Sequence, residues 1–106
     1  MLFRSVAAPE RSRLAPEVPT LEESGWKGID MRTWHGLLGP AGLSADIVGR
    51  LHGAISRGMH APEFRDKLAR DGVDVVANSP AEFDAFIRSE IPRWAKVIRA
   101  VGVKLD

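Results

Sequence analysis

The feature that most constrains the fold of this 106-residue chain is the segment Ser79-Pro80-Ala81-Glu82, with the apolar pattern that follows it. A serine at the N-cap, a proline at the first helical position and a glutamate three residues after the cap are typical of a helix start. We predict a helix from this cap to a C-cap at Gly102, kinked at Pro92 because proline removes one hydrogen bond of the helical ladder. The side chains expected on its buried face are Phe83, Phe86, Ile87, Ile91, Trp94, Val97, Ile98 and Val101.

Two shorter helices are predicted before it. Ser44 is the expected N-cap of a helix that ends near Met59. Pro62 is suited to the first turn of a second helix, which reaches Arg70 and is stopped by Gly72. The apolar faces predicted for these two helices comprise Ile47, Val48, Leu51, Ala54, Ile55 and Met59 in the first, and Phe64 and Leu68 in the second.

The rest of the chain predicts short strands and turns. Residues 3–8, 29–38 and 73–77 have the apolar content or alternation of strands. Thr20 and Glu23 have capping-box spacing and predict a short turn that Gly25 closes. This order of elements indicates an α/β fold with an incomplete sheet and three main helices.

Composition removes several classes of function. The 15 Lys and Arg residues balance 14 Asp and Glu residues, which disfavours a nucleic-acid partner held through phosphate contacts. The absence of cysteine excludes disulfides, thiolate nucleophiles and Cys-ligated zinc. No apolar run approaches the roughly 20 residues of a membrane helix, so no direct membrane insertion is expected.

The amino terminus has two interpretations. Residues 1–5 lack the charged start, the apolar stretch and the cleavage site of a secretory signal, so the chain read literally is not exported. The sequence Leu2-Phe3-Arg4-Ser5 is also what the end of a common sequencing adaptor encodes. On that second interpretation residues 1–5 are non-native and the gene is truncated upstream.

The residues that could carry chemistry do not form a catalytic set. His52 and His60 lie eight residues apart on one predicted helix, too far for one metal ion, and are expected to be surface or half-buried histidines. Glu22 and Glu23 are adjacent, so their carboxylates do not face each other. His35 follows Trp34 on a predicted strand and is either a partly buried polar group or a donor at a cleft. We therefore predict no enzyme activity, no metal and no cofactor.

Several segments, taken in order, resemble one known family. Residues 16–25, 33–42, 79–83, 94–98 and 102–106 are similar to the Bug-type family, the substrate-binding components of tripartite tricarboxylate transporters. The chain departs from the family pattern at His35, where an aromatic residue is usual, at His52, where Asn is common, and at Pro92.

The resemblance implies a type II periplasmic binding protein with two α/β lobes and a carboxylated solute held between them. Its members are about three times as long, so this chain corresponds to their carboxy-terminal third. Residues 1–28 would be a remnant of the second lobe, residues 29–38 the segment that crosses between lobes, and residues 39–106 the carboxy-terminal part of the first lobe. Membrane subunits of the transporter are the implied protein partners.

The resemblance also implies a site and leaves an alternative. Only the crossing residues Thr33, Trp34, His35 and Gly36 are expected to line the ligand cleft, and Trp34 is equally expected to seal the hinge core instead. Truncated in this way, the chain is expected not to bind solute alone. The alternative is a small stand-alone α/β interaction domain, derived from the same family, that binds no solute.

Overall fold

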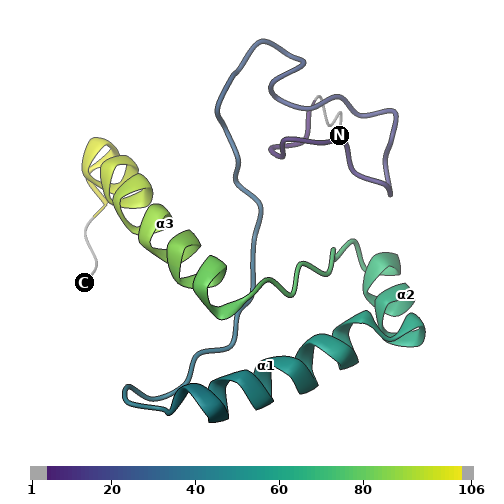
Figure 1. The fold of residues 1–106 in the computed structure, drawn as a ribbon. Helices are drawn as coiled ribbons and strands as arrows, with labels where there is room; N and C mark the ends of the chain where they lie inside the picture. Colours follow the sequence, from purple (N-terminus) through teal and green to yellow (C-terminus); the bar gives the residue numbers. More distant parts are fainter. Residues whose placement is uncertain (1–4, 104–106) are drawn as a thin grey trace. The chain divides into compact units, whose positions relative to one another are not determined.

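The computed structural model describes residues 5–103, and within them the chain forms three α-helices (Figure 1). They are α1 (Ala45–His60), α2 (Pro62–Arg70) and α3 (Pro80–Val101). The chain divides into two compact units: Met1–Leu43 with His60–Val75, and Ser44–Met59 with Val76–Asp106. Residues 3 and 4 of the first predicted strand lie outside the described residues.

The helix ends of the second unit confirm the predicted caps. The Ser44 hydroxyl oxygen accepts a hydrogen bond from the Ile47 amide at 3.3 Å, and α1 begins at the next residue. At α3, Ser79 and Glu82 form a complete capping box, and Gly102 ends the helix in a left-handed conformation with φ of 73°. The helix continues through Pro92 to Val101, so the proline lies inside one unbroken element.

The local signals of the first unit are also confirmed. Helix α2 starts with proline in its first turn and runs over the predicted residues, and Gly72 follows it with φ of 75°. Thr20 and Glu23 cap the predicted turn reciprocally. The Thr20 amide donates to Glu23 Oε2 at 2.7 Å, and the Glu23 amide donates to Thr20 Oγ1 at 3.1 Å.

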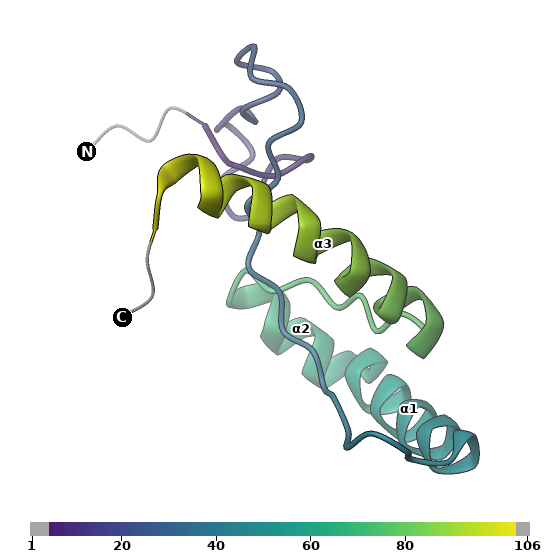
Figure 2. The same ribbon diagram turned by 90° about the vertical axis from the view of Figure 1, so that its left-hand side faces the viewer.

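The three predicted strands are not formed within residues 5–103. β-Pairing there is limited to one isolated parallel bridge between Val6 and Thr20. Residues 29–38 run as an extended segment, and neither Figure 1 nor Figure 2 shows a strand paired with it. The segment 73–77 ends at Ala77, whose φ of 42° lies outside the β region. A strand requires a ladder of hydrogen bonds to a neighbour, and the described residues supply only isolated contacts, such as the Val6–Thr20 bridge and the hydrogen bond from the Met31 amide to the Ala7 carbonyl.

The apolar faces predicted for the helices are half-buried or exposed in this structure, so the expected burial of the α2 and α3 faces is wrong. Among the described residues Thr20, 3% exposed, is the only buried one, and no hydrophobic side chain is buried. Part of the predicted apolar set is half-buried: Val48, Met59, Leu68, Phe83, Phe86, Ile87 and Trp94. The rest is exposed: Ile47, Leu51, Ala54, Ile55, Phe64, Ile91, Val97, Ile98 and Val101. Helical periodicity specifies which side of a helix is apolar, but burial needs a second layer to cover that side.

Candidate functional site

The four residues predicted to contact ligand lie together on the extended segment 29–38. Thr33, Trp34, His35 and Gly36 are consecutive and exposed, and 46% of the Trp34 surface is accessible. The hydroxyl of Thr33, the indole N–H of Trp34 and the ring of His35 are all hydrogen-bond donors. The segment thus places three donor side chains within three residues, on backbone that belongs to no helix or sheet.

The start of this segment is fixed to the first unit by backbone and side-chain contacts. The Met31 amide donates to the Ala7 carbonyl at 2.9 Å, next to the Val6–Thr20 bridge. Asp30 accepts from Arg32 three times: from its backbone amide at 3.1 Å, from Nε at 2.9 Å and from Nη2 at 2.6 Å. These contacts restrain the chain immediately before Thr33.

Arg32 is the residue that sequence reasoning overlooked. It adjoins the predicted ligand-binding residues and carries a guanidinium, the group best suited to binding a carboxylate through two hydrogen bonds. Asp30 raises the pKa of Arg32 mainly by hydrogen bonding to its guanidinium, with smaller coulombic effects of Asp30, Glu10 and Asp74. Because Asp30 already occupies Nε and Nη2, Arg32 is engaged within the protein. The alternation Asp30-Met31-Arg32 indicates this pair, since residues two apart share a face of an extended chain.

Glu23 is held in a structural network rather than at a reactive position. Arg11 donates to its carboxylate through Nε at 2.9 Å and Nη2 at 2.7 Å, and donates through Nη1 to the Pro16 carbonyl at 3.0 Å. The Arg11 hydrogen bond, followed by the Thr20 amide, lowers the pKa of Glu23 from 4.5 to about 2. A carboxyl group with that pKa stays ionised near neutral pH and is unsuited to acid or base chemistry.

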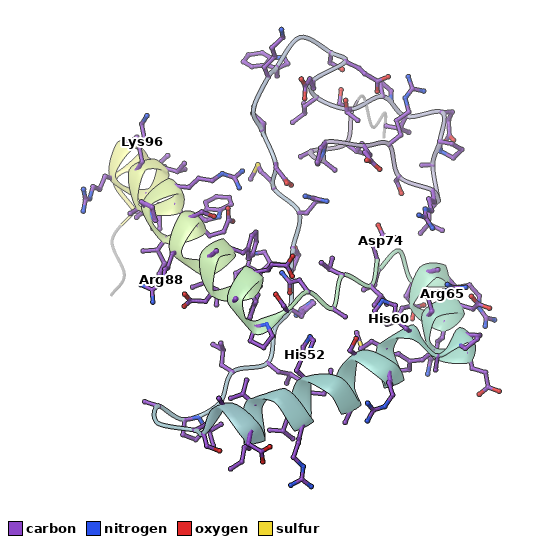
Figure 3. The ribbon with its side chains drawn as sticks, viewed as in Figure 1. His52, His60, Arg65, Asp74, Arg88 and Lys96 are labelled. Atoms are coloured by element: carbon purple, nitrogen blue, oxygen red, sulfur yellow. The ribbon has the colours of Figure 1, made fainter. Side chains whose placement is uncertain are left out.

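The two helix histidines have different surroundings. His52, on α1, is half-buried and its Nε2 lies 3.0 Å from the Asn78 carbonyl oxygen, a contact between residues 26 apart. Figure 3 shows His52 extending from α1 toward the segment that leads into α3. His60, at the end of α1, is exposed. The prediction of a surface or half-buried position is therefore confirmed for both, and the His52 contact is new information from the structure.

Within residues 5–103 no three His, Cys, Asp or Glu side chains come close enough together to hold a metal ion. None of the three described helices combines the length and the apolar character that a membrane span requires.

The fold corresponds to part of one class of protein, the periplasmic binding proteins. The chain is similar to the structure of the periplasmic binding protein BugD, with a TM-score of 0.80 and 29% identity, over 94% of this chain and 34% of that one. It is also similar to an R. palustris protein solved with adipate, with a TM-score of 0.77 and 26% identity, over 92% and 33% of the two chains. The prediction of a partial binding-protein fold with three main helices is confirmed.

The chain belongs to the family described as the tripartite tricarboxylate transporter family receptor, whose sequence pattern matches residues 2–103. Protein BugT of Bordetella pertussis is 30% identical over 101 residues, which are 95% of this chain and 31% of that protein. A UPF0065 protein of Pseudomonas sp. strain P51 is 32% identical over 94 residues, 88% of this chain and 28% of its own length. The chain thus spans about a third of these relatives, and the family is one of receptors rather than enzymes.

Proposed function

We propose that this chain is the carboxy-terminal third of an extracytoplasmic solute-binding protein that captures a carboxylated small molecule for a tripartite tricarboxylate-type transporter. The observation that carries the proposal is the family match over residues 2–103. The similarity to BugD, a periplasmic binding protein, supports the periplasm as the place where the full-length protein acts. Its partners would be the solute and the membrane subunits of the transporter.

A carboxylate ligand is supported by the chemistry of the candidate site and by one neighbour. The R. palustris structure contains adipate, a dicarboxylate, which makes adipate the natural first probe. We propose that Thr33, Trp34 and His35 donate hydrogen bonds to carboxylate oxygens, and that Gly36 lets the ligand approach the backbone closely. These four residues form a continuous exposed stretch, as a cleft-lining segment requires.

The proposed layout of the chain follows the same reasoning. Residues 1–28 would belong to the second lobe, residues 29–38 would cross between the lobes, and residues 39–106 would complete the first lobe. The other side of the cleft would come from segments present in the relatives and outside this match. We therefore propose that the 106 residues by themselves do not retain solute.

Calorimetry with adipate tests the proposed site in a completed protein, in which the chain is preceded by its upstream genomic sequence. Loss of one hydrogen bond to a charged ligand costs about 1.5 kcal/mol, or roughly tenfold in affinity. Thr33→Ala and His35→Ala should each weaken binding by about that factor, whereas the matched control Thr33→Ser keeps the hydroxyl and the affinity. Unchanged affinity in both alanine variants would leave these residues with structural roles only.

Sequencing of the upstream genomic region separates the main proposal from its alternative. The proposal expects a signal peptide and about 200 further residues of this family before residue 1, in keeping with the relatives' three-fold greater length. An in-frame stop codon directly before residue 1, in clean long-read sequence, would instead favour a stand-alone interaction domain without a solute.

A further inference from the structure

Helix α3 contains a proline at a position where the helical ladder needs a backbone donor. Pro92 has no amide hydrogen to donate to the carbonyl of Arg88, and a proline ring in a helix interior crowds that carbonyl. Such a residue usually kinks or breaks a helix. Helix α3 nevertheless continues from Pro80 to Val101, and Figure 2 shows it as one continuous helix. The turns before and after Pro92 thus stay joined with one backbone hydrogen bond fewer.

The carboxylate of Glu90 connects these turns. Its Oε1 accepts from Arg93 Nη1 at 2.8 Å, and its Oε2 accepts from Trp94 Nε1, also at 2.8 Å. Glu90 precedes Pro92 and both donors follow it, so each hydrogen bond spans the proline. The guanidinium of Arg93 also lies over the Trp94 ring, 5.4 Å from its centroid. The side chains of Glu90, Arg93 and Trp94 form one cluster, which we call the Glu90 bridge.

The burial of Glu90 distinguishes this bridge from a surface ion pair. The Glu90 side chain is 12% exposed, whereas Asp84 and its partner Arg88, on the same helix, are 61% and 77% exposed. Exposed pairs contribute little because water competes for both charges, whereas hydrogen bonds shielded from water are electrostatically stronger. We therefore expect the Glu90 bridge to restrain α3 more than the Asp84–Arg88 pair does.

We propose that the Glu90 bridge keeps α3 continuous across Pro92, in place of the backbone hydrogen bond that the proline removes. Both of its hydrogen bonds restrain the turn around the proline. When the bridge opens, Pro92 becomes a hinge, and residues 93–101 are released from the preceding turns. This conformational device lies outside the proposed ligand-binding segment and does not depend on the proposed function.

A double-mutant cycle with Pro92→Ala tests the proposal on the 106-residue chain. Alanine restores the backbone donor, so the bridge becomes redundant in that background. Glu90→Ala should lower the urea midpoint of the original chain, and should lower that of the Pro92→Ala chain much less. Asp84→Ala is the matched control, because it removes an ion pair that does not span Pro92, and it should lower both midpoints equally. Equal losses for Glu90→Ala in the two backgrounds would overturn the proposal.

NMR of the isotope-labelled chain locates the effect along α3. In Glu90→Ala, the Cα chemical shifts of residues 93–101 should lose helical character, because a helix this short is marginal on its own. Those of residues 80–88 should keep it. Helical shifts retained throughout residues 93–101 would contradict the hinge. If Glu90→Ala fails to fold, Trp94→Phe takes its place in both experiments, since it keeps an aromatic ring and removes the indole donor.

Discussion

Replacing Ser79 by alanine removes the hydroxyl at the centre of the α3 capping box. That hydroxyl accepts from the Glu82 amide at 3.3 Å and donates to Glu82 Oε2 at 2.6 Å. The third contact, from the Ser79 amide to Glu82 Oε2 at 2.8 Å, survives the substitution. Loss of a serine cap costs about 0.5–2 kcal/mol, and because one contact persists we expect about 1 kcal/mol.

Urea unfolding followed by circular dichroism measures this loss. With a denaturant slope of about 1.5 kcal/mol/M, the midpoint of Ser79→Ala should fall by roughly 0.7 M. Ser79→Thr retains the hydroxyl and is the matched control, expected to keep most of the original midpoint. A Ser79→Thr midpoint as low as that of Ser79→Ala would show that the capping hydroxyl is not what stabilises this end of α3.

The same variant has a predicted pH dependence. The Ser79 hydroxyl, followed by the Ser79 amide, lowers the pKa of Glu82 below its usual 4.5. A carboxyl group with a lowered folded-state pKa contributes stability above the unfolded pKa and loses it as the pH falls through the folded value. The midpoint difference between Ser79→Ala and the unsubstituted chain should therefore shrink below pH 4.5, and a difference that grows in acid would refute the reasoning.

Three further predictions concern other parts of the chain. The Arg11–Glu23 contact should persist down to a pH of about 2, because the pKa of Glu23 is lowered to that value. The NMR signal of Arg11 Nε reports this contact, and a shift of that signal near pH 4.5 would contradict the prediction. Ala77→Gly should raise the free energy of unfolding by up to about 1 kcal/mol. The substitution relieves about 1–2 kcal/mol of backbone strain in the folded state, which exceeds the cost of the greater conformational entropy of glycine in the unfolded chain. A lower urea midpoint for this variant would argue against strain at Ala77. The chain alone should self-associate in sedimentation velocity, and Leu51→Gln with Val101→Gln should reduce this association because both side chains are exposed. A chain that stays monomeric would favour the stand-alone domain.

The features predicted correctly share one physical property, which is that they depend on residues close in the sequence. The Ser79–Glu82 and Thr20–Glu23 boxes join residues three apart, and Gly102 ends α3 through its own backbone conformation. The contacts that were missed join distant residues, such as Arg11 with Glu23 and His52 with Asn78. Local spacing gives no information on which distant side chains meet.

The candidate site illustrates the same division. The sequence indicated Thr33, Trp34, His35 and Gly36 through the family resemblance, and the family itself is now established. The engagement of Arg32 was overlooked in the sequence, and the structure shows that its guanidinium donates two hydrogen bonds to Asp30 and its backbone amide donates a third. The ligand contacts of the four residues remain a prediction.

By itself, the sequence determined the three helices, their caps, the capped turn at Thr20 and the family, because helical hydrogen bonds and capping contacts close within a few residues. The tertiary structure decided that residues 29–38 and 73–77 do not form strands, that Thr20 is buried while the helix faces are not, and that His52 contacts Asn78. A strand needs a second strand to pair with, and a buried face needs another surface to cover it; both come from elsewhere in a polypeptide. Hydrophobic periodicity shows which side of an element is apolar, but it does not show which surface covers that side.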